Sequence, residues 1–104
     1  MKTKVAAIGD KDVVMMMKSI GLETFYVNDA DGVRETILRL EQDDYKIIFI
    51  TQTQAAMVED FLRTYETKPY PIILPIPDSN GNGFGVEKLI KNMERTIGSA
   101  SSLK

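Results

Sequence analysis

The sequence predicts an α/β domain with a parallel sheet of four strands. Four short apolar or β-prone segments alternate with four segments whose apolar residues recur every three or four positions, which is the spacing of one helix face. Helical connections between strands of one sheet imply parallel strands, and such crossovers are right-handed. The first and third strand segments are apolar on both faces, so we expect them at the centre of the sheet.

The first strand is expected at residues 5–8, a short apolar run that ends at a glycine. Either Asp10 or Asp12 can cap the following helix by accepting hydrogen bonds from its first free backbone N–H groups. Val14 and Met15 lie off the apolar face of this helix, and we expect them to be the better candidates for an adaptable interface. The apolar face itself comprises Val13, Met16, Met17 and Ile20.

The second strand is expected at residues 24–27, which are β-prone, few in number and polar at their start. These features favour an edge position. The turn-forming residues 28–32 also supply a cap for the second helix, and the acidic and polar residues 41–44 end it. The apolar face of this helix comprises Val33, Ile37 and Leu40.

Residues 46–50 give the strongest strand signal in the chain, because the four residues after Lys46 are apolar and so lie on both faces of the strand. Thr53 is the expected cap of the third helix. Pro69 stops this segment, since the residue before a proline avoids the helical region. The broad apolar face of the third helix comprises Met57, Val58, Phe61, Leu62 and Tyr65.

The last strand is expected at residues 71–77. Pro75 and Pro77 cannot donate to a β-ladder, so this strand should lie at an edge of the sheet or end at Leu74. A glycine-rich connector then leads to a final helix, expected at about residues 86–97.

These segments form one predicted domain over residues 1–98, followed by a flexible tail over residues 99–104. The glycines before the final helix leave that helix free to change position. The two apolar strands lie in the middle if the strand order is 2-1-3-4, which is that of a flavodoxin-like or receiver-like three-layer fold without the fifth strand.

The predicted topology leaves one face of the sheet half covered. Right-handed crossovers place the first helix over the first two strands, and the second and third helices on the opposite face. The third and fourth strands therefore need a cover on the face of the first helix. Either the final helix or a partner protein can supply it, since uncovered apolar sheet is uncommon on a monomer.

Composition excludes several classes of function. The 104 residues include no cysteine and no histidine, so disulfides, thiolate metal sites and catalytic arrangements that need either residue are ruled out. A net charge of −2 argues against nucleic acid as the main partner, because that binding needs a clustered basic face. The longest apolar run is far shorter than the roughly 20 residues of a membrane span, and residues 1–4 lack the apolar core of a signal peptide. We therefore expect a cytoplasmic protein.

Asp10 and Asp12 follow the first strand, where phosphoryl-receiver domains hold Mg²⁺ with acidic residues. Thr51 stands where such domains carry their acceptor aspartate, and no lysine follows the last strand at the corresponding place. The two aspartates are therefore interpreted as a helix cap and turn. The glycines at residues 81–85 follow the fourth strand and not the first, so they do not match a dinucleotide-binding fingerprint. We expect no catalytic, cofactor-binding or metal-binding residues.

Five short segments carry a family resemblance, in the order Ile8-Gly9-Asp10-Lys11-Asp12, Ile20-Gly21, Ile47-Ile48-Phe49-Ile50-Thr51, Pro71-Ile72-Ile73-Leu74-Pro75-Ile76-Pro77 and Ile97-Gly98. Their order and spacing, with the total length, resemble the F subunit of V-type and archaeal A-type rotary ATPases over about residues 3–98. The resemblance implies a non-catalytic subunit of the central rotor stalk. As partners it implies the coiled-coil D subunit, the ring of catalytic A and B subunits, and the stalk subunit that joins the membrane rotor.

Through these partners the resemblance implies a part in coupling ATP hydrolysis or synthesis to the transport of H⁺ or Na⁺. The protein would lie at the cytoplasmic side of the membrane, without a cofactor and without insertion into the bilayer. The surface that binds the D subunit is expected on the last strand and the final helix, at Ile72, Leu74, Ile76, Phe84, Leu89, Ile90, Met93 and Ile97.

Three alternatives stay open. The same eight residues can instead cover the domain's own sheet. The chain can also be a degenerate receiver-like signalling module that binds a protein partner without being phosphorylated. An enzyme of small-molecule metabolism has only the fold in its favour, and a fold does not imply a function.

Overall fold

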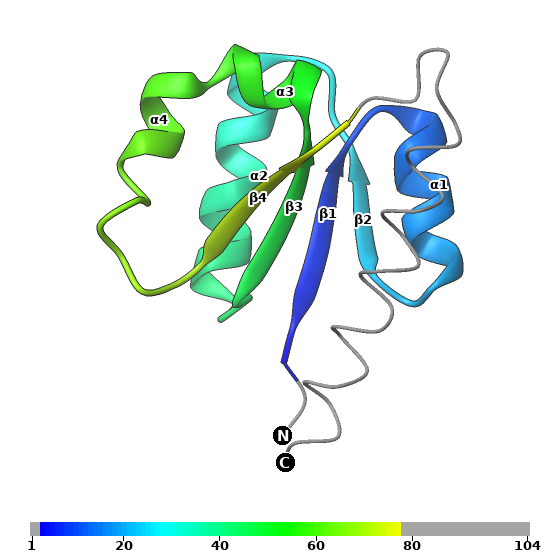
Figure 1. Ribbon diagram of the computed structural model, residues 1–104, viewed down its shortest axis with the longest axis horizontal. Helices are drawn as coiled ribbons and strands as arrows, with labels where there is room; N and C mark the ends of the chain where they lie inside the picture. Colours follow the sequence, from blue (N-terminus) through cyan, green and yellow to red (C-terminus); the bar gives the residue numbers. More distant parts are fainter. Residues whose placement is uncertain (1–2, 78–104) are drawn as a thin grey trace.

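The computed structural model of the chain describes residues 3–77, in which strands and helices alternate (Figure 1). In chain order the elements are β1 (Val5–Gly9), α1 (Lys11–Ser19), β2 (Glu23–Tyr26), α2 (Ala30–Gln42), β3 (Ile47–Thr51), α3 (Gln52–Met57), α4 (Glu59–Arg63) and β4 (Ile72–Ile76). The strands pair in parallel in the order β2-β1-β3-β4. The predicted α/β fold with a four-stranded sheet of order 2-1-3-4 is confirmed.

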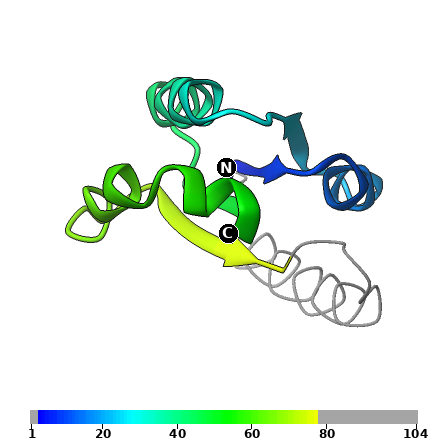
Figure 2. The same cartoon turned by 90° about the horizontal axis from the view of Figure 1, so that it is seen from above.

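The two faces of the sheet are covered by different helices. On one face, which we call the α1 face, Val13 and Met17 of α1 form a buried cluster with Ala7, Phe49 and Ile76 of the strands. On the other, the α2 face, the strands pack against α2 and residues 52–65, which contain α3 and α4 and which we call the α3–α4 segment. Figure 2 shows α1 and α2 on opposite sides of the strands.

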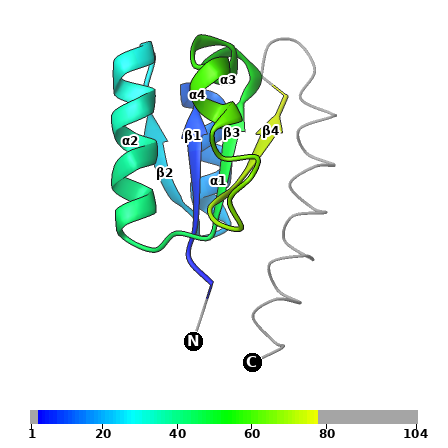
Figure 3. The same ribbon diagram turned by 90° about the vertical axis from the view of Figure 1, so that its left-hand side faces the viewer.

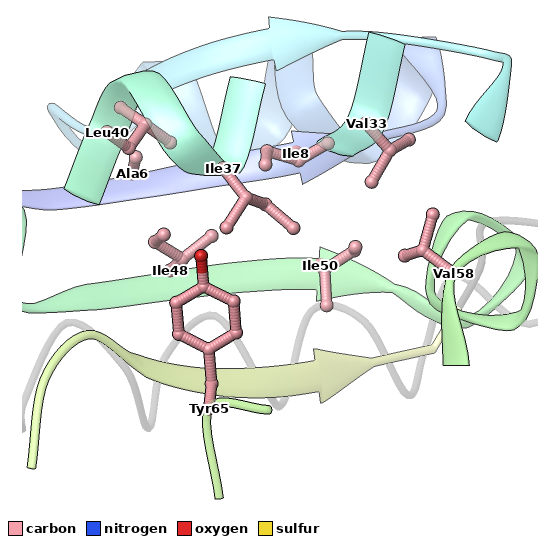
Figure 4. Packing of buried hydrophobic residues seen from close by; sticks show 9 residues of the cluster. All are labelled: Ala6, Ile8, Val33, Ile37, Leu40, Ile48, Ile50, Val58 and Tyr65. Atoms are coloured by element: carbon pink, nitrogen blue, oxygen red, sulfur yellow. The ribbon is translucent and has the colours of Figure 1, made fainter. Parts of the chain in front are cut away.

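Successive side chains of a strand point to opposite faces of the sheet. The side chains of β1 and β3 that point to the α2 face belong to the larger of the two cores. Side chains of β1 and β3 meet those of α2 there, and two residues of the α3–α4 segment complete the cluster (Figure 4). Its members are Ala6, Ile8, Val33, Ile37, Leu40, Ile48, Ile50, Val58 and Tyr65.

Aspartates cap the first two helices. The carboxylate of Asp10 accepts a hydrogen bond from the backbone N–H of Val13 at 3.0 Å. Asp29 accepts one from the N–H of Gly32 at the same distance, at the start of α2. Of the two predicted candidates for the first cap, Asp10 is the cap, while Asp12 lies in the first turn of α1.

The buried side of α1 differs from the predicted one. Val14 is buried together with Val13 and Met17, whereas Met16 is only partly buried. The prediction that Val14 is available to an interface is therefore wrong, while Met15 is exposed as expected. α1 contacts both β1 and β2, and the apolar spacing alone does not decide which side of the helix these contacts bury.

The predicted third helix is two short helices. They are separated at Val58, whose φ of −135° and ψ of 36° are not helical. The prediction that Thr53 caps this segment is also wrong, because α3 begins directly after β3 with Thr51 in the N-cap position. Val58 is nevertheless buried, so the apolar spacing continues across the break.

β4 lies at the edge of the sheet and continues through Pro75 to Ile76. Of the two expectations for this strand, the edge position is therefore confirmed and the earlier end at Leu74 is not. Within residues 3–77, no helix is long and apolar enough to cross a membrane. The predicted connector, the final helix at 86–97 and the tail at 99–104 lie outside the described residues.

Candidate functional site

The carboxyl end of the sheet, between β1 and β3, is where open α/β folds usually bind ligands. Here the side chain of Thr51 fills the position beside Gly9. A Cβ atom on Gly9 would lie 2.4 Å from Cγ2 of Thr51, so only glycine fits this point of β1. The close approach of these two strand ends leaves this crevice occupied by the protein's own atoms.

Gln54 completes the filling of this crevice. Its side chain is only 1% exposed, and its amide nitrogen donates to the carbonyl of Val27 at 3.1 Å. Its amide oxygen accepts a hydrogen bond from the hydroxyl of Thr51. These bonds tie β3 and α3 to the segment after β2, so the polar atoms at this edge satisfy one another.

No acidic cluster suited to a cation lies in the described part of the chain, where no group of three or more Asp, Glu, His or Cys side chains could hold a metal ion. Asp10, the acidic residue closest in sequence to β1, is used to cap α1. The polar side chains of Asp10, Thr51 and Gln54 at the carboxyl end of the sheet thus hold neighbouring strands and helices together.

The outer strand β4 presents a different kind of surface. Ile72 and Leu74 are 44% and 41% exposed, so two aliphatic side chains lie at the surface of one strand. They alternate with Ile73 along the strand and so lie on the α1 face, next to the partly buried Ile47, which pairs with Ile72 in the register. α1 does not reach this part of its face, because it packs beside β1 and β2.

Three of the eight residues predicted to bind a partner can be placed. Ile72 and Leu74 form an exposed aliphatic pair, which we call the β4 patch. Ile76 is 2% exposed and belongs to the buried cluster on the α1 face. The other five predicted residues, Phe84, Leu89, Ile90, Met93 and Ile97, lie outside the described residues.

Tyr70 and Lys46 extend the surface around the start of β4, and no motif in the sequence marks them as functional. Tyr70 is exposed, and the ammonium group of Lys46 lies 4.6 Å from the centre of its ring. Their only sequence signal is that each stands close before a strand segment. Because cation–π contacts at exposed sites are weak, the contact between Lys46 and Tyr70 holds these two side chains in place only loosely.

A hydrogen-bonded cluster holds the loop that leads into β4. The hydroxyl of Tyr65 donates to one oxygen of Glu41 at 2.8 Å, and the ammonium group of Lys68 donates to the other at 3.2 Å. The bond from Tyr65, with a smaller contribution from Lys68, lowers the pKa of Glu41 below its usual value. Burial, followed by the bond to Glu41, raises the pKa of Tyr65. The end of α2 is thereby connected to the loop between α4 and β4.

The free edge of β4 carries few hydrogen-bond donors. The N–H of Ile72 donates to the carbonyl of Lys46 at 2.8 Å, so Ile72 and every second residue after it direct their backbone groups toward β3. Ile73 and Pro75 therefore direct theirs away from the sheet. Pro75 has no N–H, so the N–H of Ile73 is the one donor that β4 itself offers at this edge. Figure 3 shows β4 as the outermost strand of the described sheet.

Comparisons with known proteins agree on one family. The family described as "ATP synthase (F/14-kDa) subunit" matches residues 5–94. The F subunit of a V-type ATP synthase from Fusobacterium nucleatum is 36% identical over 97 residues, which cover 92% of each chain. Its counterpart from the V-type ATP synthase of Clostridium perfringens is 30% identical over 94% of each chain. The F subunit of an A-type ATP synthase from Thermococcus sibiricus is 34% identical, over 91% of this chain and 94% of its own.

Proposed function

Because this chain belongs to the F-subunit family of V-type and A-type ATP synthases, we propose that it is a non-catalytic subunit of the central rotor stalk of such a complex. In this role it binds the coiled-coil D subunit. It helps to couple ATP hydrolysis or synthesis to the transport of H⁺ or Na⁺, and it lies at the cytoplasmic side of the membrane. The A and B ring and the stalk subunit next to the membrane rotor are its further neighbours.

The β4 patch is the observation that carries the D-binding part of this proposal. Ile72 and Leu74 are aliphatic, exposed and adjacent on one face of a strand. They lie on the half of the α1 face that α1 leaves uncovered, beside the partly buried Ile47. A helical partner with an apolar stripe would bury this surface and complete the layer.

The filled crevice at the carboxyl end of the sheet supports the non-catalytic part. Thr51 and Gln54 occupy the position in which a receiver-like fold would bind a cation and a phosphoryl group. Their polar atoms are used internally, and Asp10 is used as a cap. The alternative, a receiver-like signalling module, therefore has the strand order in its favour but lacks a supporting site among the described residues. A chain with that function would have to bind Mg²⁺ or an acyl-phosphate mimic.

The test is a binding measurement between the full chain and the D subunit of its own complex. Replacing Ile72 and Leu74 with aspartate is expected to weaken the complex at least tenfold, since truncating one buried aliphatic anchor can cost about 2 kcal/mol. Leu38→Asp is the matched control, because Leu38 on α2 is also 44% exposed but lies on another element. Circular dichroism of all variants checks that they are folded.

Two negative outcomes have different meanings. If the unaltered chain does not bind the D subunit, the proposed function is wrong. If the Ile72→Asp/Leu74→Asp variant is folded and binds the D subunit as tightly as the Leu38→Asp control, the function stands but the β4 patch is not the binding surface.

A further inference from the structure

We propose that a groove on the α2 face, between the α3–α4 segment and β4, is a second docking surface, and that it binds a basic amphipathic helix of a partner protein. This groove lies on the α2 face of β4, whereas the side chain of Leu74 in the β4 patch lies on the α1 face. Ile72, the other residue of the patch, also lines the first hollow, so the two surfaces meet at the start of β4.

The groove consists of two adjoining hollows. The first, of about 390 Å³, lies between α4 and β4, and the second, of about 340 Å³, lies along the outer side of α3 and α4. Both are lined by Ala55, Leu62 and Glu66, so they lie side by side, and together we call them the groove. The fold creates it because α3 and α4 have only six and five residues, and they stop before they cover β4.

The floor of the groove is apolar. Ile50 of β3 and Ile73 and Pro75 of β4 line the first hollow, and Leu62 and Ala55 line both hollows. The small side chains of Ala55 and Ala56 leave room on the helical side of the second hollow. A ridge of aliphatic side chains, spaced as on one helix face, would fit such a floor.

The rim carries two acidic groups without a salt-bridge partner among residues 3–77. The two basic side chains that line the groove are each paired, Arg63 with Asp60 at 3.1 Å and Lys68 with Glu41 at 3.2 Å. Glu59 and Glu66 line the groove and make no such pair in that range. The unneutralised charge at the rim is therefore negative, which favours an occupant with lysine or arginine beside its apolar face.

The backbone of β4 excludes a strand as the occupant. Adding a fifth strand needs alternating donors and acceptors along the free edge, but Pro75 supplies an acceptor only. The outward carbonyls of Ile73 and Pro75 can instead accept hydrogen bonds from lysine, arginine or amide side chains. An apolar floor, an acidic rim and an edge poor in donors all favour the same occupant, a helix with basic flanks.

The test uses the full ¹⁵N-labelled chain and two leucine–lysine peptides of identical composition. One peptide has the leucines at helical spacing over about four turns, and the other alternates leucine and lysine as in a strand. The helical peptide is expected to bind at least tenfold more tightly, with amide shifts at Ala55, Leu62 and Ile73. Glu59→Lys/Glu66→Lys is expected to weaken this binding about tenfold.

The matched control is Asp12→Lys/Glu35→Lys, which changes the net charge equally at exposed positions on α1 and α2 and should leave the affinity within about twofold. Equal binding of the two peptides, equal weakening by the two charge reversals, or shifts confined to the α1 face would each overturn the proposal. So would a full chain that binds neither peptide. Sedimentation of the free chain would then tell whether a second copy occupies the groove.

Discussion

Glu41, near the end of α2, holds the segment of the chain that leads into β4. It accepts hydrogen bonds from Tyr65 and Lys68, which lie on the segment that leads from α4 to the outer strand. The bond from Tyr65 is the larger cause of its lowered pKa, although partial burial opposes the shift. Because both bonds favour the carboxylate, they stabilise the fold only while Glu41 is ionised.

This linkage predicts a pH dependence of stability. A carboxyl group with a lowered pKa in the folded state contributes stability that is present above its unfolded pKa and is lost as the pH falls through the folded pKa. Glu41→Gln is therefore expected to reduce the free energy of unfolding by about 1 kcal/mol at pH 7. The difference from the unaltered chain should largely disappear near pH 3. Urea denaturation at both pH values measures it.

Tyr65→Phe provides the control for this prediction, because it removes the main cause of the lowered pKa and leaves the carboxyl group in place. In the Tyr65→Phe background, the effect of Glu41→Gln should be smaller at pH 7. An effect of Glu41→Gln that is equally large at pH 3 and pH 7 would contradict the assigned role of the carboxylate.

Single residues also show where reasoning from the sequence succeeds and fails. Thr51 stands in the sequence where an acceptor aspartate would be, and it does lie at the carboxyl end of β3. Its contact with Gly9 and its bond to Gln54 depend on the distance between strand ends, for which the sequence has no signal. The prediction for Val14 fails for a similar reason, since the side of α1 that is buried depends on how the helix packs on the strands, which the apolar spacing leaves open.

Among the elements, β4 is the one whose sequence explains its place most directly. Ile72, Leu74 and Ile76 direct their backbone groups toward β3, while Ile73 and Pro75 direct theirs to the free edge. The proline therefore costs no hydrogen bond of the sheet, and it removes a donor from the edge. Edge strands with few donors resist pairing with a second copy.

This arrangement predicts that the prolines keep the edge from pairing. Replacing Pro75 and Pro77 with alanine restores two backbone donors near the free edge, so the variant should self-associate at concentrations at which the unaltered chain stays monomeric. Light scattering coupled to size-exclusion chromatography measures the mass. The control is Pro69→Ala, which removes a proline from the exposed loop before β4. Equal monomer content in all three proteins would contradict the role given to Pro75 and Pro77.

The α3–α4 segment shows the limit of periodicity at the scale of elements. Apolar residues recur at helical spacing from Met57 to Tyr65, and this pattern predicts one continuous helix. In the structure the helix is broken at Val58, but Val58 and Tyr65 are buried in the same core. The spacing thus indicates which side chains pack against the core, although Met57, Phe61 and Leu62 are only partly buried. It does not show the break in the backbone. The groove beside β4 follows from this break and could not be predicted.

At the scale of the whole molecule, burial decreases from the centre of the sheet toward β4. β1 and β3 are buried along almost their entire length, whereas most of β4 is exposed. The sequence predicts this gradient, because the runs at β1 and β3 are apolar on both faces and β4 contains a proline. It also predicts a half-covered α1 face from the handedness of the crossovers.

The same gradient should appear in native-state hydrogen exchange of the full chain. The amides of Ile72 and Leu74, on an edge strand that is mostly exposed, are expected to exchange at least about tenfold faster than those of Ile8 and Phe49 in the central strands. Binding of the coiled-coil D subunit should slow exchange at Ile72 and Leu74 and leave α2 unchanged, if the β4 patch is the surface that this partner covers. A uniform slowing of exchange over the whole sheet in the complex would instead mean that the partner stabilises the fold globally. In the free chain, exchange at β4 that is as slow as at β1 would contradict the gradient of burial itself.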